Sequence, residues 1–259
     1  MIPEERQRRL VSLVHECGSM SIGALASDLN VSEATVRRDL EQLADAGRLK
    51  RVRGGACASR AFGRPEEDPL HFSDVVHAAT EEKSTIARLA ADLVHDGDVI
   101  ALDIGTTVSA MCPHLRSKRL TILTASLAAV RELEGAHNLD IIVLGGQLRS
   151  NYQSMVGSLT ESALRQFRID AAFLGCSGIL TDGAVLDSTP SEIPIKRTMM
   201  SIAERTYLLA DHEKFPGSGI MEIAPLSQFT ALVTDQEPTL TREGPSGPNA
   251  GYPTEVVLP

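Results

Sequence analysis

The sequence predicts an α/β protein with a small, mostly helical domain ahead of a larger domain built on a mostly parallel sheet. Two observations lead to this fold class. Residues 21–55 hold two short amphipathic patterns, followed by a basic segment that ends in paired glycines. From Glu81 to Asp235, apolar runs of strand length alternate with segments of helical spacing, which is typical of a parallel sheet with connecting helices.

The first amphipathic pattern, SIGALASDLN, indicates a short helix. Its apolar residues recur at helical spacing: Ile22, Leu25, Ala26 and Leu29. After a turn at Asn30-Val31, Ser32 is a favourable N-cap for a second helix. The expected buried stripe of that second helix consists of Val36, Leu40 and Leu43. The spacing therefore predicts two short helices joined by a tight turn.

Other residues of the second helix lie off its buried stripe and are expected to project outward. Two helices joined in this way form a helix-turn-helix, whose second helix can enter the major groove of DNA. The predicted DNA-contacting residues of this part are Ser32, Thr35, Arg37 and Arg38. The alternative is a three-helix bundle, completed by a further helix predicted over Pro3–His15, whose arginines are merely solvated.

A basic segment follows the second helix, and its cationic residues alternate with Leu49 and Val52 before two glycines. These cationic residues are Arg48, Lys50, Arg51 and Arg53. Such alternation suits a small β-hairpin, the wing of a winged helix, which would bring the cations near DNA phosphates. Arg51 and Arg53 complete the predicted set of DNA-contacting residues.

The charge of the chain is unevenly distributed. Residues 1–60 hold ten Lys and Arg against eight Asp and Glu, a net charge of +2, whereas residues 61–259 hold fifteen against twenty-six, a net charge of −11. An acidic chain does not bind polyanions in general, because a phosphate backbone repels most of its surface. DNA binding is therefore expected from the N-terminal module, and tight operator binding requires a dimer or a larger assembly.

The composition predicts a cytoplasmic protein without a cofactor, a metal or a membrane partner. No apolar run approaches the roughly 20 residues of a membrane-spanning helix. The segment MIPEERQRRL lacks the apolar core of a signal peptide. The cysteines are scattered without a C-x-x-C pair, which favours neither a disulfide framework nor a zinc site: Cys17, Cys57, Cys112 and Cys176.

The chain is expected to divide into four parts. The DNA-binding module spans residues 1–57. Residues 58–79 mix Gly, Pro and charged residues without sustained periodicity, as a linker does. The α/β domain spans residues 80–235. Residues 236–259 are rich in Pro, Gly and Thr, which predicts a disordered tail.

Within the α/β domain, the apolar runs and the segments between them give the order of elements. The expected strands are VIALD, TILTAS, IIVLGG, AAFLG, YLLAD and ALVTD. Expected helices lie over Val108–Leu115, Leu127–Leu133, Leu159–Phe167 and Ile193–Ala203, after an earlier helical pattern on Ile86, Leu89, Ala90 and Leu93. In such a domain the ligand site lies at the carboxyl ends of the strands, where the loops emerge.

The ends of five strands offer small, hydroxyl-bearing or charged residues. After the first, Gly105 permits close approach of the backbone, and Thr106 and Thr107 add hydroxyls at a helix start, a natural cradle for phosphate. The full predicted pocket consists of Asp103, Gly105, Thr106, Thr107, Thr124, Ser126, Gly145, Gly146, Arg149, Ser177, Asp211 and Lys214. The spacing matches neither a P-loop nor a dinucleotide fingerprint, which disfavours ATP and NAD.

Taken together, the two halves resemble the DeoR family of bacterial transcription regulators, from about Glu4 to Asp235. The resemblance rests on TVRRDL and RVRGGA in the first half and on DIGTT, TAS, LGG, DAAFLG and ADHEKF, in the family's order, in the second. It implies a winged-helix DNA-binding domain and a sensor domain similar to ribose-5-phosphate isomerases. It also implies a phosphorylated sugar or polyol as effector, and a homodimer or homotetramer.

The resemblance assigns the phosphate contacts and the effector-facing charges to these positions: Gly105, Thr106, Thr107, Asp211 and Lys214. Two positions depart from the family's pattern. Ala125 stands where asparagine is common, which removes an amide that could contact a sugar hydroxyl. Arg53 stands where histidine is common, and it keeps a donor for a DNA phosphate.

The expected function is that of a repressor of a carbohydrate-metabolism operon, released from double-stranded operator DNA by a phosphorylated sugar or polyol; activation through the same sensor stays open. The alternative is a sugar-phosphate isomerase with a DNA-binding appendage, which needs a carboxylate base and a cation beside the reacting carbon. The loops offer Asp103, Asp182, Asp187, Glu192 and Lys214. No acid-base pair stands out among them, and the sequence favours a regulator over an enzyme.

Overall fold

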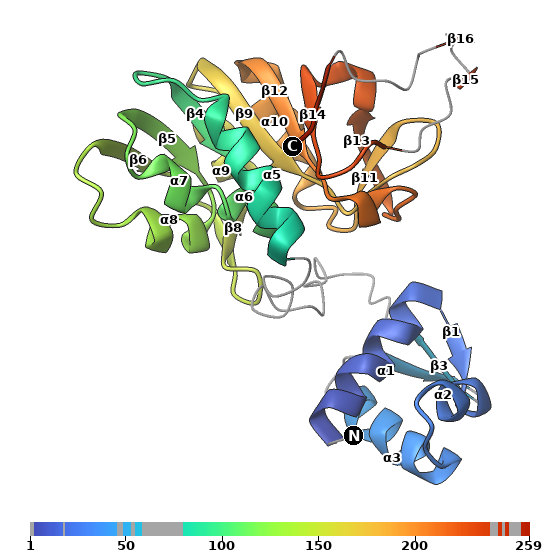
Figure 1. Cartoon of the computed structure of the whole chain (residues 1–259). Helices are drawn as coiled ribbons and strands as arrows, with labels where there is room; N and C mark the ends of the chain where they lie inside the picture. The colour runs from blue at the N-terminus through green and yellow to red at the C-terminus, as the bar shows by residue number, and fades with distance from the viewer. Residues whose placement is uncertain are drawn as a thin grey trace. The chain divides into compact units, whose positions relative to one another are not determined.

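The computed structural model describes residues 3–17, 19–45, 49–52, 55–58, 80–238, 243–244, 247–248 and 255–259. The chain divides into two compact units, Met1–Pro69 and Leu70–Pro259 (Figure 1). Each unit has a hydrophobic core of its own. Of the predicted linker, residues 58–79, only Ala58 lies within the described residues, where it ends a strand.

The N-terminal unit is a winged helix-turn-helix, as the sequence predicts. Its elements are α1 (Pro3–Cys17), β1 (Ser19–Ser21), α2 (Ile22–Asp28), α3 (Glu33–Asp45), β2 (Leu49–Val52) and β3 (Gly55–Ala58). The predicted apolar stripes of α2 and α3 are buried against α1, and the residues of this core include Leu10, Val14, Leu25, Leu29, Val36, Leu40 and Leu43. The burial of both helices on one core gives the motif its fixed angle.

The predicted wing is confirmed as an antiparallel hairpin of β2 and β3, with Val52 opposite Gly55. A strand that the sequence did not predict, β1, adds to its other side and gives the order β1-β3-β2. A side chain at Gly55 would overlap the carbonyl oxygen of Met20. The glycine that ends the basic segment is therefore required by the close approach of β1.

The larger unit is built on a seven-stranded sheet in the order β17-β14-β12-β9-β4-β5-β6, in which every pairing is parallel. Its strands are β4 (Val99–Leu102), β5 (Leu120–Thr124), β6 (Leu139–Val143), β9 (Ile169–Gly175), β12 (Ala203–Leu209), β14 (Ala231–Val233) and β17 (Glu255–Val257). The six strands predicted from apolar runs are confirmed, and so is the α/β class.

Helices cover both faces of this sheet (Figure 1). One face carries α5 (Thr80–Asp92), α6 (Thr106–Ser109), α7 (Cys112–Leu115) and α8 (Leu127–Leu133), and the other carries α9 (Ser158–Leu164) and α10 (Ile193–Ile202). Neighbouring residues of β4 face opposite cores, since Ile100 and Leu102 pack under α5–α8 and Ala101 packs under α10. The predicted helix over Val108–Leu115 is wrong as one element, because the chain forms the two short helices α6 and α7 there.

Several small elements escaped prediction because each is only a few residues long. They are the hairpin of β7 (Gln147–Arg149) and β8 (Ser154–Val156), the sheet of β10 (Gly178–Ile179), β11 (Ala184–Asp187) and β13 (Met221–Pro225), and the 3₁₀ turns η1 (His212–Lys214) and η2 (Leu226–Gln228). The small sheet lies over the same core as α10. These elements matter because they bring charged residues over the ends of the large sheet.

The prediction of a disordered tail over residues 236–259 is wrong for its last part. Glu255–Val257 form the edge strand β17, paired with β14, and the Thr234 amide donates to the Val257 carbonyl. Earlier in the tail, β15 (Glu243–Gly244) pairs with β16 (Gly247–Pro248). The Pro and Gly content of the tail dominated the prediction, but Val256 and Val257 are β-branched residues that suit an edge strand.

Candidate DNA-binding surface and effector site

The turn between α2 and α3 is built from local capping. The Ser21 hydroxyl accepts from the Ala24 amide, and the Ser32 hydroxyl accepts from the Thr35 amide at 3.2 Å, so both serines act as N-caps. Asn30 between them has a φ of +51°, a left-handed conformation that asparagine tolerates better than most residues. The predicted N-cap role of Ser32 is confirmed, and its hydroxyl also contacts the Thr35 hydroxyl.

The outward face of α3 carries the predicted arginines. Arg37 and Arg38 are exposed, and Thr35 is half-buried beside the cap. Arg37 forms an i,i+4 ion pair with Glu33 at 2.7 Å, and both side chains are more than half exposed. A pair this exposed contributes little stability, so the guanidinium group can exchange Glu33 for a base edge or a phosphate at small cost.

A buried ion pair that the sequence analysis missed holds α3 against α1. Asp39 is 2 % exposed and accepts two hydrogen bonds from the Arg6 guanidinium, at 2.6 and 3.1 Å. This bidentate pairing orients α3 and explains why an aspartate follows the two arginines. Its signal could not be found locally, because the two residues are 33 positions apart. Within the wing, Arg51 belongs to β2, whereas Arg53 lies outside the described residues.

The larger unit has a topological switch point between β4 and β9. From β4 the sheet continues to β5 and β6 on one side and to β9, β12 and β14 on the other. Loops at the carboxyl ends of two such strands diverge and leave a crevice, which is where ligands bind in open α/β sheets. Asp103 lies at this point directly after β4, and its Oδ2 accepts from the Gly175 amide at the end of β9.

Lys196 of α10 is the centre of a buried ion cluster at the switch point. Its ammonium group lies 2.5 Å from Asp103 Oδ2, 3.1 Å from Asp187 Oδ2 and 2.9 Å from the Gly175 carbonyl. The two carboxylates hold the pKa of Lys196 well above its usual value, against the opposing effect of burial. With all its donors engaged, Lys196 fixes the carboxyl ends of β4, β9 and β11 relative to one another.

The same cluster includes a second pair, between Arg149 of β7 and Glu192 at the start of α10. Burial raises the pKa of Glu192 to about 8; Asp187 and Asp103 add to this, while Lys196 and Arg149 oppose it. The cluster thus holds three carboxyl groups and two cations. Arg149 Nη2 has no hydrogen-bond partner among the described residues, although it is buried. The predicted residue Arg149 therefore has a donor left for a ligand.

The predicted phosphate loop lies beside this cluster. Thr106 and Thr107 open α6 and are buried, and neither hydroxyl takes part in a hydrogen bond between described residues. A Cβ placed on Gly105 would make only ordinary contacts with Gly175 and Asp103, so the fold itself does not require this glycine.

Three charged groups meet at the end of β12. Asp211 is 2 % exposed, and its Oδ1 has no partner among the described residues. Lys83, in the first turn of α5, is buried close by, and the sequence analysis did not single it out. Burial lowers the pKa of Lys83 and so does the neighbouring Lys214, whereas Asp211 raises it. The predicted pair Asp211 and Lys214 thus gains a third charged neighbour from α5.

Five other predicted pocket residues have structural roles. The groups that were expected to face a ligand are engaged in contacts within the fold. Thr124 donates to the Leu102 carbonyl and accepts from the Ser126 amide, and the Ser126 hydroxyl accepts from the Ala129 amide to cap α8. The Ser177 hydroxyl accepts from the Ser188 amide. At Gly146 a side chain would overlap the Thr160 hydroxyl, while the Gly145 carbonyl accepts from that same hydroxyl. Effector contact by these five residues stays a prediction.

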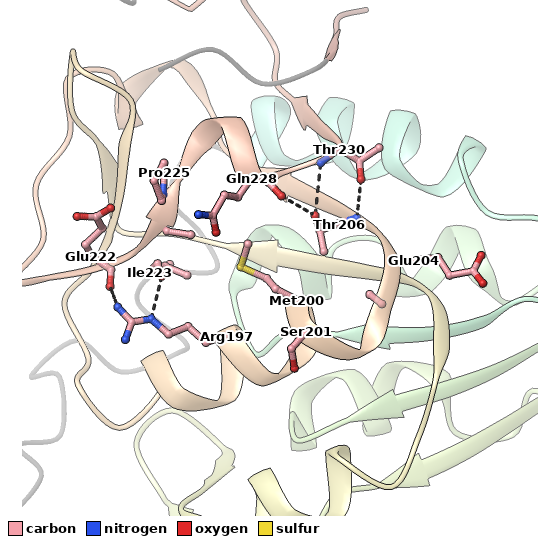
Figure 2. Close-up of a pocket in the computed structure, with 12 residues that line it drawn as sticks. Arg197, Met200, Ser201, Glu204, Thr206, Glu222, Ile223, Pro225, Gln228 and Thr230 are labelled. Carbon is pink, nitrogen blue, oxygen red and sulfur yellow. Dashed lines mark hydrogen bonds between the residues drawn. The ribbon is translucent and has the colours of Figure 1, made fainter. Parts of the chain in front are cut away.

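A cavity of about 650 Å³ lies elsewhere, at the amino end of β12, between α10 and β13 (Figure 2). None of its lining residues belongs to the predicted effector set. The Arg197 guanidinium in it donates to the carbonyls of Glu222 and Ile223, so its charge is already engaged (Figure 2). Glu204 and Glu222 also line this cavity, and their charge disfavours an anionic ligand.

Two further observations concern the described residues only. No group of three or more His, Cys, Asp or Glu side chains there could hold a metal ion. No helix there is both long enough and apolar enough to cross a membrane.

Comparison with known proteins identifies the domain type of each unit. A model of the DeoR-like helix-turn-helix domain matches residues 6–60, and a model of the DeoR C-terminal sensor domain matches residues 78–236. The HTH-type transcriptional repressor CsqR of Escherichia coli is 35 % identical over 90 % of this chain and 88 % of its own. The glycerol-3-phosphate regulon repressor of the same organism is 32 % identical over 92 % of each chain.

Among solved structures, ribose 5-phosphate isomerase A from Methanocaldococcus jannaschii matches 53 % of this chain and 55 % of its own, with 18 % identity and a TM-score of 0.39. A likeness this distant says nothing about activity. The enzyme alternative is wrong, since the matched domains are those of DNA-binding regulators. The chain belongs to the DeoR family and is a DNA-binding transcription regulator with a C-terminal sensor domain.

Proposed function

We propose that this regulator represses transcription and is released from its operator by a phosphorylated sugar or polyol. Its similarity to named repressors supports the sign of regulation: CsqR of Escherichia coli and the glycerol-3-phosphate regulon repressors of Haemophilus influenzae and Escherichia coli. The regulated genes of this chain belong, on this proposal, to carbohydrate metabolism.

The observation that carries the effector proposal is the loop Gly105–Thr107 at the switch point. Thr106 and Thr107 are buried residues whose hydroxyls have no partner among the described residues, and the first N–H groups of a helix have no partner within it. Since α6 has only four residues, its macrodipole adds little, and the donors themselves would bind the phosphate. Lys214, which follows β12, would supply the cation, because Lys196 is held by three acceptors.

The rest of the effector would lie across the switch point. Arg149 has a spare donor, and Asp211 a spare acceptor, and both are buried. These groups suit the hydroxyls of a sugar or polyol, which can both donate and accept. Ala125 is buried and contributes only a backbone carbonyl, which accepts from the Met155 amide.

For DNA binding, we propose that Arg37 and Arg38 contact base edges while Arg51 and Arg53 contact phosphates. Ser32 and Thr35 would place the start of α3 at the groove. A homodimer or homotetramer would present two such helices to related half-sites. Effector binding would shift the population toward an arrangement of DNA-binding units that no longer matches the half-site spacing.

Isothermal titration calorimetry tests the effector proposal. Sugar and polyol phosphates are each compared with their unphosphorylated parents, on wild-type protein and on Thr106→Val. The phosphorylated member of at least one pair should bind more tightly, and Thr106→Val should weaken it by about 1–3 kcal/mol, because a donor is lost at nearly constant volume. Thr206→Val is the control, since Thr206 is equally buried but lines the cavity at the opposite edge of the sheet.

Equal affinity for every phosphate and its parent would contradict a phosphate site. Normal binding by Thr106→Val would show that the phosphate, if bound, lies away from the Gly105–Thr107 loop.

A further inference from the structure

The hairpin of β7 and β8 is attached to the carboxyl end of β5, the strand next to β4. Ser154 of the hairpin forms a bridge with Ser126, two positions after β5 ends, and the Met155 amide donates to the Ala125 carbonyl. The strand β5 pairs in parallel with β4, whose end leads to the loop Gly105–Thr107. Neighbouring strands lie about 5 Å apart, so this hairpin is within reach of a small ligand that starts at the loop.

Two buried polar side chains without partners lie on the same face of this hairpin. Arg149 and Ser154 are directly opposite each other in β7 and β8, and the side chains of such a pair share one face. They are 5 % and 0 % exposed, and neither Arg149 Nη2 nor Ser154 Oγ has a hydrogen-bond partner among the described residues. The Arg149 guanidinium group also lies 5.2 Å from the centre of the Tyr152 ring, a contact that stabilises its orientation.

A third polar group comes from the turn before α10. Arg149 Nη1 pairs with Glu192, so the guanidinium group reaches this turn. The hydroxyl of Ser191, the preceding residue, is buried and also has no partner among the described residues. Three buried polar groups from two separate parts of the chain are thus unsatisfied at one place. Each costs free energy, which a ligand that supplies its partner recovers.

The charges around these groups determine which ligand they suit. The surrounding buried cluster has three carboxyl groups and two cations: Asp103, Asp187, Glu192, Arg149 and Lys196. An acid group of a ligand would add a fourth negative charge, and the low dielectric of a buried site strengthens the repulsion. A neutral ligand oxygen avoids this repulsion and can still accept from Arg149. Hydroxyl groups can in addition both donate to and accept from serine hydroxyls.

We propose that Arg149, Ser154 and Ser191 form a specificity subsite that binds two neighbouring hydroxyl groups at the uncharged end of the effector. This inference rests on the proposed phosphate site and adds the ligand class: a phosphate monoester whose other end, a few carbons away, carries a vicinal diol and no acid group. A site built to bind hydroxyl groups rejects an analogue that lacks them, because its own polar groups are then left unpaired. The subsite therefore distinguishes phosphate esters that the loop Gly105–Thr107 binds alike.

Isothermal titration of the full-length protein tests the ligand class with two matched pairs of an alcohol and its acid. The pairs are ribitol 5-phosphate with 5-phosphoribonate and glucitol 6-phosphate with 6-phosphogluconate, and inorganic phosphate is the fifth probe. The members of a pair differ only at carbon 1, which is a hydroxymethyl group or a carboxylate. In at least one pair the alcohol should bind about tenfold more tightly than both its acid and inorganic phosphate.

Ser154→Ala and Ser191→Ala test the residues, since each removes one hydroxyl from the subsite. Each variant should bind that alcohol about five- to tenfold more weakly and inorganic phosphate with unchanged affinity, a separation that general damage to the fold would not produce. Ser201→Ala is the matched control, because the Ser201 hydroxyl donates to the Thr198 carbonyl near the other end of α10. Its affinities should all be unchanged. Should Ser154→Ala fail to fold, Ser191→Ala, in a half-buried turn position, still gives the test.

The outcomes separate this inference from the function on which it rests. If inorganic phosphate binds but neither alcohol binds more tightly than its acid, the subsite is wrong and the phosphate site stands. Unchanged affinity for the alcohol in Ser154→Ala and Ser191→Ala would overturn the subsite as well. If no probe binds more tightly than chloride at equal ionic strength, the phosphate site and the subsite are both overturned.

Discussion

In the N-terminal unit, the arginines expected to touch DNA are neighbours in sequence and are exposed on one helix. In the sensor unit, the charges of the cluster at the switch point are buried and come from elements far apart, and Asp103 and Lys196 are 93 positions apart. Arg37 has an exposed partner that it can leave at little cost, whereas Lys196 is held by three acceptors.

This difference bears on how function and stability are related in each unit. An exposed charge can be removed without disturbing the fold, so its loss reports on DNA binding alone. A buried charge is balanced by other buried charges, so its removal leaves a carboxylate unpaired in a nonpolar interior. The sensor site must therefore be tested with substitutions that respect the charge balance.

The largest effect is expected at the centre of the buried cluster. Lys196→Met should lower the free energy of unfolding by about 3–5 kcal/mol, because Asp103 and Asp187 lose their shared partner. Arg165→Met, which breaks an exposed ion pair with Glu161, should cost at most about 1 kcal/mol. Urea unfolding of both variants measures the difference. A loss below 1 kcal/mol in Lys196→Met would show that the cluster does not hold the strand ends together.

At the DNA-binding surface, Arg37→Ala and Arg38→Ala should weaken operator binding by about 1–3 kcal/mol per half-site, if each contacts a base. Folding and effector affinity should stay intact. Arg165→Ala is a matched control, since it removes an i,i+4 partner of similar exposure from the other unit. Unchanged affinity of both arginine variants in a gel-shift titration would refute the assignment of α3 as the recognition helix.

The raised pKa of Glu192 predicts that the stability of the folded protein depends on pH through this buried site. Its pKa is about 8 in the folded protein and near 4.5 when unfolded, so the folded state binds a proton more tightly between these values. The stability from this group is complete below pH 4.5 and is lost as pH rises through 8. Glu192→Gln should flatten that fall when unfolding is measured at pH 6 and pH 8. An equal fall in stability in the variant and the wild type would show that a group other than Glu192 titrates over this range.

The smallest effect is expected in the wing. Arg51→Ala and Arg53→Ala should weaken binding to all DNA sequences alike and reduce the slope of log affinity against log salt by about one unit each. Filter binding over a salt series measures this slope. Should either variant change base preference at one operator position, the wing would contact bases as well as phosphates.

Short sequence patterns were sufficient to predict most of the N-terminal unit, because each pattern lies within a single helix or strand. Ser32, the stripe of α3 and the alternation from Leu49 to Val52 each lie within one element, and the structure has all three. The exceptions are the strand β1 and the pairing of Asp39, whose partner Arg6 is on another helix. Burial and pairing across elements are set by the packing of α1, which no short pattern specifies.

In the sensor unit the sequence predicted the six strands and the edge of the sheet where polar residues gather. It could not predict which of those residues meet. Lys196 lies within a helix of ordinary spacing, Glu192 at the start of that helix, and Asp103 directly after β4. Only the strand order, with its reversal between β4 and β9, brings them to one place.

The central claim is that a phosphorylated ligand at the sensor site releases the DNA-binding unit. Fluorescence anisotropy tests it with full-length protein and a labelled operator selected from random DNA, titrated with a sugar or polyol phosphate that binds in calorimetry and with its unphosphorylated parent. The phosphate should raise the dissociation constant for DNA and the parent should not, while Thr106→Val should bind the operator normally and stay bound. Release by the parent alone, or undiminished operator affinity at saturating phosphate, would contradict the account.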